Sequence, residues 1–454
     1  MKNIYLYNYS VKGIKSLNET VTLSFYKKCI NKDMEDTRKY NIKGIYGMNG
    51  SGKSGIIASV NILKNLIVNP EYLNNPIVQK NLDEMINKKL GELYIEADYI
   101  IKHKYGIMIF NYTVTLSKND VGKYVISHER LAQKNKDSKH EIRKIIFEVS
   151  DGELVTEYKN KFYETIHKKT MNLLSNASLP ALTLEKYIIP LKDKINSEEG
   201  LVGNMLFIGI LMLINFGGNI HVYLDQEDEH RKYLVLNMID DTDDSDIELF
   251  AEKLSEIEKP SIKSISSGRT IVVKEMYSKF ESTVAQLYEF IKIFKSDLKN
   301  IEIDKKEDGD FWVCNLVMVY DDYRIDSEFE STGIKKLIKL FAYLKEMVNG
   351  SIVFIDEFDS NLHDVYLCAL LEYLMEYGEG QLCFTTHNVG PMDILKQNKM
   401  SIDFLSEDHK IYPWKNNGNC SPSNLYRKGL INGTHFNIDF VDFIDVFNAS
   451  REAE

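Results

Sequence analysis

The stretch that decides the fold is GMNGSGKS, from Gly47 to Ser54. It matches the phosphate-loop pattern G-x-x-x-x-G-K-[ST], in which glycines let backbone amides converge on phosphate oxygens. The short stretch IKGIY, from Ile42 to Tyr46, predicts a strand before the loop, and the apolar-periodic run Ser54 to Ile67 predicts a helix after it. Because this pattern marks a nucleotide site when it lies between a strand and a helix, the chain is expected to bind a nucleoside triphosphate.

Each position of this loop has an expected role. Lys53 would reach the β- and γ-phosphates, and the hydroxyl of Ser54 would ligate Mg²⁺. The following helix would add its positive end to the site. The residues expected to bind the nucleotide here are Gly47, Asn49, Gly50, Ser51, Gly52, Lys53, Ser54 and Gly55.

A second motif, IVFIDE from Ile352 to Glu357, lies about 300 residues further along the chain. Its apolar residues predict a buried strand that delivers two carboxylates at its C-terminal end, where open α/β sheets place their sites. Asp356 would hold Mg²⁺, and Glu357 would orient and polarise the attacking water. The two motifs together predict that the chain hydrolyses ATP as well as binding it.

The motif FTTHN, from Phe384 to Asn388, ends the next predicted strand with the imidazole of His387. A histidine at this place could donate a hydrogen bond to the γ-phosphate and sense its loss. We therefore add His387 to Lys53 and Glu357 as a predicted catalytic residue.

The motif ESTG, from Glu330 to Gly333, precedes a predicted helix over Gly333 to Val348. Ser331 and the amide of Gly333 at this helix start form another anion site. Because the chain already has its own phosphate loop, this site indicates binding of the γ-phosphate of ATP held by a second subunit. An ordinary helix cap without a ligand is the alternative.

The predicted elements fall into three stretches. Patterns typical of strands occur at Ile4 to Phe25, Glu92 to Arg130 and Ile145 to Tyr158. From about Tyr163 to Lys299 the pattern is mostly helical. The alternation of strands and helices from Trp312 to Thr385 favours a parallel sheet with covering helices.

We therefore predict an α/β fold with a mixed sheet and covering helices. Residues 1–165 and 301–454 would form the two parts of an ATPase head, and residues 166–300 would form a mainly helical inserted lobe, with a short coiled coil as one form of it. The most apolar run, Met205 to Ile214, is too short for a bilayer, which needs about 20 residues, so a buried core helix is expected.

Composition sets limits on the class of protein. The net charge of −11 argues against a protein coated in basic surface for nucleic acid, although a local basic groove is compatible with it. The 5 cysteines lie far apart and form no C-x-x-C pair, which fits a reducing cytosol without a disulfide framework or a zinc site. A cytoplasmic location and no role at a membrane are expected.

The order of phosphate loop, long insertion, Ser-x-Gly, Asp-Glu and His resembles the ABC-type ATPase heads of the SMC, RecF and OLD group. The sequence is most similar to the bacterial AAA family ATPases of the AAA-15 and AAA-21 branch. In that branch the strand typically continues as Asp-Glu-x-x-x-x-Leu-His, and Asp356 to His363 reads DEFDSNLH. Opening strands that end in Leu23-Ser24-Phe25 also resemble this branch.

The resemblance implies further roles. Ser331 and Gly333 would stand for the ABC signature, Asn361 would lie in the loop that touches the partner head, and His387 would be the switch histidine. Thr332 and Ile334 depart from the family's Gly and Gln, which concerns the efficiency of hydrolysis across the dimer more than nucleotide binding. Gln133 and Glu129 are candidates for the Gln loop, and ordinary strand-end polarity is the alternative for Glu129.

The expected function is that of an ATPase that uses ATP and Mg²⁺, dimerises head to head around two ATP molecules and controls a separate effector. The resemblance adds that such proteins look like the ATPase components of bacterial anti-phage or abortive-infection systems, with a nuclease or toxin as effector. Two alternatives remain open at this point. One is a RecF-like DNA-binding repair ATPase, and the other is a scaffold that holds ATP as a static ligand.

Overall fold

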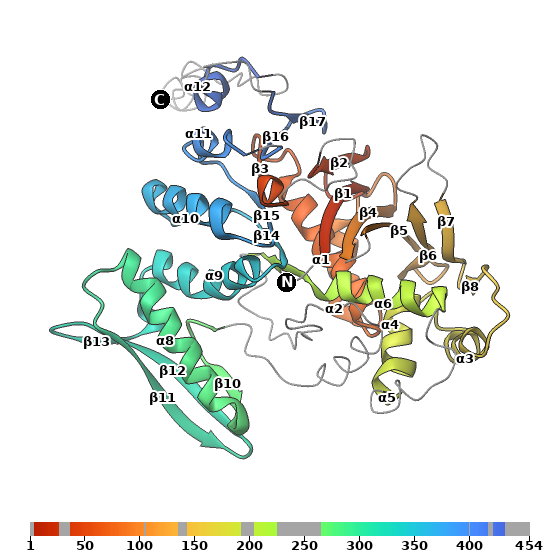
Figure 1. Cartoon of the computed structure of the whole chain (residues 1–454), viewed down its shortest axis with the longest axis horizontal. Coiled ribbons are helices and arrows are strands. Elements are labelled where there is room, and N and C mark those ends of the chain that lie inside the picture. Colours follow the sequence, from red (N-terminus) through yellow and green to blue (C-terminus); the bar gives the residue numbers. More distant parts are fainter. Residues whose placement is uncertain are drawn as a thin grey trace, which may run out of the picture.

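A computed structural model of the chain describes residues 4–26, 37–103, 106–134, 143–191, 204–224, 265–398, 400–415 and 421–431 (Figure 1). These residues form a parallel sheet, a large antiparallel sheet and a small sheet in a projecting lobe. Helices lie between and around the sheets. The predicted α/β class with a mixed arrangement of strands is confirmed.

The parallel sheet carries the ends of the motifs. Its strand order is β17-β16-β3-β15-β14-β9, and β17 alone in this order runs antiparallel to its neighbour. The strands are β3 (Ile42–Tyr46), β9 (Ile220–Tyr223), β14 (Ile352–Ile355), β15 (Gln381–Thr385), β16 (Ile402–Leu405) and β17 (Ile411–Pro413). β3, β14 and β15 are buried at every position, as strands covered on both faces are. The predicted strands before the phosphate loop, before Asp356 and before His387 are therefore spatial neighbours.

The antiparallel sheet has the order β2-β1-β4-β5-β6-β7-β8. Its strands are β1 (Ile4–Lys12), β2 (Val21–Ser24), β4 (Glu92–His103), β5 (Gly106–Lys118), β6 (Tyr124–Lys134), β7 (Arg143–Ser150) and β8 (Glu153–Leu154). The turn between β7 and β8 holds Asp151 and Gly152 at φ of 49° and 81°, as a two-residue hairpin turn of the primed type requires. The strands predicted at Ile4 to Phe25, Glu92 to Arg130 and Ile145 to Tyr158 are confirmed.

Helix α1 (Lys53–Val68) leaves the phosphate loop and lies between the two large sheets (Figure 1). Helix α6 (Met205–Gly218) packs against it so closely that a Cβ atom at Gly217 would lie 2.5 Å from Ile67. The apolar run at Met205 is thus a buried core helix, as predicted. No helix in the described ranges is long and apolar enough to cross a membrane.

Shorter elements complete this main core. They are η1 (Thr37–Tyr40), α2 (Pro76–Met85), α3 (Lys161–Thr170), α4 (Leu179–Thr183), the π-helical turn η2 (Leu184–Ile188) and α5 (Ile189–Leu191). Side chains of α1, α4, α6 and the antiparallel sheet share one hydrophobic cluster with Phe354 of β14. Much of the region expected as an inserted helical lobe therefore packs into the head.

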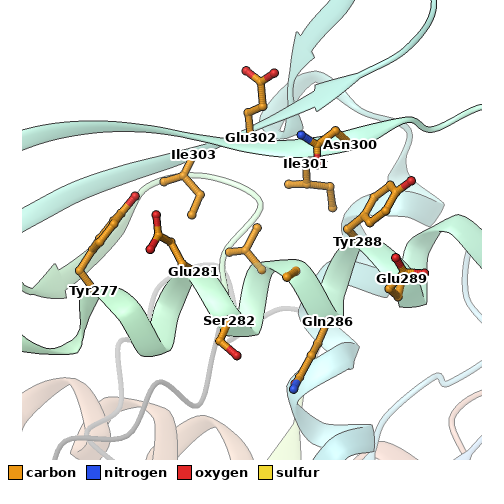
Figure 2. A pocket seen from close by; sticks show the side chains of 12 residues that line it. Tyr277, Glu281, Ser282, Gln286, Tyr288, Glu289, Asn300, Ile301, Glu302 and Ile303 are labelled. Carbon is orange, nitrogen blue, oxygen red and sulfur yellow. The ribbon is translucent and has the colours of Figure 1, made fainter.

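A separate lobe projects from the head at the lower left of Figure 1. It consists of β10 (Thr270–Val273), η4 (Lys274–Met276), α8 (Tyr277–Phe294), β11 (Asn300–Asp308), β12 (Phe311–Val319), β13 (Arg324–Asp326) and η5 (Ser327–Phe329). Among the residues described here the lobe is one helix on a small sheet. Residues 192–203 and 225–264 of the expected insertion lie outside the described residues, so the coiled coil stays a prediction. An open groove runs between α8 and the start of β11, with Glu281, Tyr288 and Ile301 among its lining residues (Figure 2).

Helix α9 (Thr332–Val348) joins this lobe to the head. Its first half contributes Leu337 and Ile338 to the core of the lobe, and its second half contributes Leu344 and Met347 to the core under the parallel sheet. The remaining helices are α10 (Asp364–Tyr377), α11 (Met392–Leu395) and α12 (Pro422–Arg427). Because α9 belongs to two cores, a movement of the lobe against the head would move this helix.

Candidate nucleotide site

The phosphate loop follows β3 and curls into the start of α1. Gly50 and Gly52 have φ of 79° and 107°, the left-handed region that favours glycine. A Cβ atom at Gly47 would lie 2.4 Å from the backbone oxygen of Leu405, and one at Gly52 would lie 2.5 Å from Leu17. The glycines of the motif are therefore required by the backbone itself.

The outer side of the loop is held by two side chains that the sequence did not single out. The hydroxyl of Ser16 donates to the backbone oxygen of Gly50 at 3.4 Å. The ring of His409 lies 3.1 Å from the backbone oxygen of Ser51. Asn49 and Gly50 at the tip of the loop are exposed, whereas Gly55 lies inside α1.

Lys53 points back into the loop. Its ammonium donates to the backbone oxygens of Gly47 at 2.7 Å and Met48 at 2.9 Å. Burial lowers the pKa of Lys53 to about 8, against the opposing influence of the carboxylates of Asp356 and Glu357. The ammonium is therefore held by two carbonyl oxygens in a position from which an anion could compete for it.

Asp356 lies at the end of β14, within hydrogen-bonding distance of the first turn of α1. The hydroxyl of Ser54 donates to its Oδ1 atom at 3.1 Å, and the hydroxyl of Thr385 donates to the same oxygen at 2.6 Å. These contacts join β14, β15 and α1 around one carboxylate. Asp356 and Ser54, the two predicted Mg²⁺ ligands, are thus side by side although about 300 residues separate them in the sequence.

Glu357 is exposed and occupies a strained backbone position. Its φ of 48° is in the left-handed region, which costs a residue other than glycine about 1–2 kcal/mol. Its amide donates to Thr385 Oγ1 at 2.8 Å, and its backbone oxygen accepts from the ammonium of Lys336 at 2.5 Å. Strained residues of this kind persist only where the surroundings fix them, and they cluster at functional sites.

His387 lies one strand further, after β15. Its amide donates to Asp359 Oδ2 at 3.3 Å, and the amide of Asn388 donates to the same oxygen at 3.1 Å. Burial, followed by the nearby charge of Lys53, lowers the pKa of His387 below its ordinary value. The imidazole is therefore neutral at pH 7 and keeps one N–H group with which to donate.

The start of α9 forms a second group of predicted residues. Ser331 is the N-cap, and its hydroxyl accepts from the amide of Ile334 at 3.4 Å. The hydroxyl of Thr332 donates to Asn361 Oδ1 at 3.3 Å, and a Cβ atom at Gly333 would lie 2.7 Å from the backbone oxygen of Asn361. The predicted signature and the predicted loop at the partner head are therefore in contact.

These groups fit ATP and Mg²⁺ by the chemistry of their atoms. α1 is 16 residues long and begins at Lys53, so its first amides and its positive end face the loop. The hydroxyl of Ser51 is buried with no hydrogen-bond partner among the described residues, which leaves it available to a ligand. A serine hydroxyl and an aspartate carboxylate are the oxygen ligands that Mg²⁺ prefers.

The structure brings together Lys53, Ser54, Asp356, Glu357 and His387 in one group and Ser331, Gly333 and Asn361 in another. Sequence reasoning missed Thr385, Asp359 and Lys336, which connect these groups. Thr385 and Asp359 lie within or beside recognised motifs, so their positions carried a weak signal. Lys336 gave none, because a lysine in a helix is ordinarily exposed.

The two candidates for the Gln loop, Glu129 and Gln133, both lie on strand β6. Glu129 is fully buried in β6, where it accepts from Tyr112 Oη at 2.8 Å and from the amide of Leu179 at 3.0 Å. Burial raises the pKa of Glu129 to about 7. Glu129 therefore anchors the start of α4. Gln133 lies half-buried on the same strand.

Residues 42–393 match the model of the family described as "AAA domain, putative AbiEii toxin, Type IV TA system". The chain belongs to this family. The predicted resemblance to AAA-21 ATPases is thereby confirmed, and the chain is a P-loop ATPase domain of the AAA family.

No curated protein matches the sequence of this AAA-family domain. Among solved structures it is similar to the SMC head domain from Thermotoga maritima, with 12% sequence identity and a TM-score of 0.34 over 91% of this chain and 100% of that chain.

Proposed function

We propose that this AAA-family domain is an ATPase that dimerises head to head and uses its nucleotide cycle to control a separate effector protein. The observation that carries the proposal is the convergence of Lys53, at the start of α1, with Asp356 and Glu357, which follow β14. Three charged groups of this kind form the arrangement expected for phosphoryl transfer to water.

The residues of the first group would have separate roles in binding and hydrolysing ATP. Lys53 would exchange its two carbonyl partners for phosphate oxygens, which are stronger acceptors because they are charged. Ser54 and Asp356 would hold Mg²⁺, whose chemistry is to neutralise charge on the phosphates. Glu357 would orient and deprotonate the water, and His387 would donate a hydrogen bond toward the γ-phosphate.

Dimerisation is proposed from the second group. Ser331 and Thr332 are exposed at the start of a 17-residue helix, a place where amides and the helix dipole favour an anion. The side chain of Phe329 just before it is 75% exposed. An exposed aromatic beside an anion-binding helix start is suited to burial against a partner head that carries its own nucleotide.

The effector and the defence role rest on the family alone. The family's description names a toxin and a toxin–antitoxin system, and we extend this to the chain as a proposal. The proposed setting is bacterial anti-phage defence by abortive infection, with a nuclease or toxin as the controlled effector. The net charge of −11 does not favour the alternative of a DNA-binding repair ATPase.

Native mass spectrometry of tagged Glu357→Gln protein, purified with ATP from its own host, tests the proposal. This change should slow hydrolysis and hold the assembly in its ATP-bound form. A second protein present in a fixed ratio to the ATPase is the expected result, and its mass identifies the effector. A nucleotide-bound dimer that carries nucleic acid and no protein would replace the proposal with the repair function.

A further inference from the structure

Lys336 is a buried lysine on α9 that none of the roles above requires. The residue is 3% exposed, and its ammonium contacts the backbone oxygen of Glu357 at 2.5 Å and the hydroxyl of Ser360. The same ammonium lies 5.8 Å from the centre of the Tyr223 ring. Burying an ammonium group has a large desolvation cost, which is offset only where well-placed acceptors surround it. A methionine would fill the same space without this cost, so the charge calls for an explanation.

The partner of this ammonium is the turn that holds the catalytic carboxylate. The backbone of Glu357 is fixed from two sides, because its amide donates to Thr385 of β15 and its oxygen accepts from Lys336 of α9. The amide of Ser360 also donates to that oxygen at 3.0 Å. Lys336 therefore touches both ends of the turn from Glu357 to Ser360. Its loss would release the left-handed backbone of Glu357 on one side.

The same helix begins at the residues that would meet the partner's nucleotide. Ser331 caps α9, Thr332 contacts Asn361, and Lys336 lies little more than one helical turn further on. Helix α9 thus touches the segment from Glu357 to Asn361 at both ends of that segment. Anion binding at the start of α9 can therefore change the position of the Glu357 backbone through the helix and the ammonium of Lys336.

We propose that Lys336 is a positioning residue that couples the position of the Glu357 turn to the position of the start of α9. This inference rests on the proposed function, because it requires a partner's ATP at Ser331 and Gly333. When that ATP binds, α9 takes a fixed position, and Lys336 holds the carbonyl of Glu357 so that its carboxylate is aligned with the ATP of its own chain. Each chain then hydrolyses its ATP in response to the ATP of the other.

The test compares Lys336→Met with the parent and with Lys345→Met. Methionine keeps the unbranched stem and its packing while it removes the ammonium. Lys345 provides a matched control, since it is an exposed lysine in the last turn of the same helix and its ammonium contacts Gln286. For each protein we would measure ATP affinity, turnover against ATP concentration, thermal unfolding, and hydrogen exchange at the amides of Glu357 and Ser360 without nucleotide.

We expect Lys336→Met to bind ATP within about twofold of the parent and to unfold at a similar temperature. Its kcat should fall at least about tenfold, its Hill coefficient should fall toward one, and the two amides should exchange faster. Lys345→Met should match the parent in all four measurements. A KM nearly unchanged beside a reduced kcat distinguishes positioning from a loss of folding.

Three outcomes would overturn the inference. One is parental turnover and an unchanged Hill coefficient in Lys336→Met. Another is a loss of turnover accompanied by equal losses of affinity and of thermal stability, which would make Lys336 a structural residue. The third is unchanged exchange at the two amides. Glu357→Gln is measured in parallel, because undiminished turnover in that variant would refute the proposed function itself, whatever Lys336→Met does.

Discussion

The phosphate loop and the start of α9 both favour anions, but the chain completes only the first of them. Around the loop, side chains from α1, β14 and β15 meet at one carboxylate, with Ser54 and Thr385 both bound to Asp356. At the start of α9, Ser331 and Thr332 are exposed. The Ser331 hydroxyl caps the helix, the Ser331 amide donates to Glu330 Oε2 at 3.2 Å, and the Thr332 hydroxyl donates to Asn361. Under the proposed function, one chain alone binds its nucleotide at the loop, and the start of α9 would contact the nucleotide of a partner chain.

The largest expected effect concerns Glu357. Glu357→Gln should reduce turnover by about 10²- to 10⁴-fold, the usual contribution of a general base, while ATP affinity stays close to that of the parent. Phosphate release and equilibrium binding measure the two quantities. Glu379→Gln, a change at an exposed glutamate after α10, is the control and should behave like the parent. Equal turnover in the two variants would remove Glu357 from the catalytic group.

The next largest expected effect concerns Lys53, whose replacement tests ATP binding at the phosphate loop separately from hydrolysis. Lys53→Ala should weaken ATP binding about 100-fold, because charge-assisted hydrogen bonds to phosphate are lost. Titration with a fluorescent ATP analogue measures this loss. Lys89→Ala, at an exposed lysine, serves as control. If Lys53→Ala bound ATP as tightly as the parent, the phosphate loop would not be the nucleotide site.

The pKa of Lys53 predicts a pH dependence of binding. With a pKa of about 8, the ammonium is about nine-tenths neutral at pH 9, so ATP affinity should be about tenfold weaker there than at pH 7. Affinity measured across this range should be flat in Lys53→Ala. A decline of the same size in both proteins would assign the titration to another group.

The lowered pKa of Lys53 also predicts how the free energy of unfolding changes with pH. The pKa of Lys53 is lower in the folded chain than the ordinary value of 10.5, so the unfolded chain binds more protons between pH 8 and 10.5. The contribution of Lys53 to the free energy of unfolding therefore increases with pH across that window. Below pH 8 the charged lysine is held at a cost to the folded state.

The smallest effect concerns Thr385, which joins the carboxylate to the catalytic turn. Thr385→Val should lower turnover about threefold and the free energy of unfolding by about 1–3 kcal/mol, because Asp356 loses a donor and the amide of Glu357 loses its acceptor. Turnover and thermal unfolding are measured together. Thr170→Val is the matched control, since the buried hydroxyl of Thr170 bonds within α3 and far along the chain from the site. A change in stability without any change in turnover would make Thr385 a structural residue alone.

How far the sequence could predict this molecule differs between its parts. The strands before Gly47, Asp356 and His387 were predicted because each is a short apolar run that ends in polar residues, and the structure places them side by side. Their order in the sheet comes from long-range pairing, which no local pattern encodes. The pairing of β9 with β14 is an example, since nothing near Ile220 points to Ile352.

The projecting lobe was predicted less well for a similar reason. β11 reads NIEIDKKED, which is too polar to stand out as a strand, and it is stabilised by pairing with the apolar β12. Its helix α8 lies in the stretch predicted as mostly helical, but the sequence did not show that a sheet would cover that helix. Lys336 illustrates the limit for the site, because burial of a charge depends on acceptors that are distant in the sequence.

The most direct test of the central claim asks whether the start of α9 completes the site of a partner. Ser331→Asp keeps a good helix cap and places a negative charge where the partner's phosphate would bind. We would measure by native mass spectrometry the mass of Glu357→Gln with Mg²⁺ and ATP, and the mass of the same protein that also carries Ser331→Asp. We expect two chains with two nucleotides for the first, and one chain with one nucleotide for the second. A single chain in both proteins, or a dimer that persists in the Ser331→Asp protein, would contradict that claim.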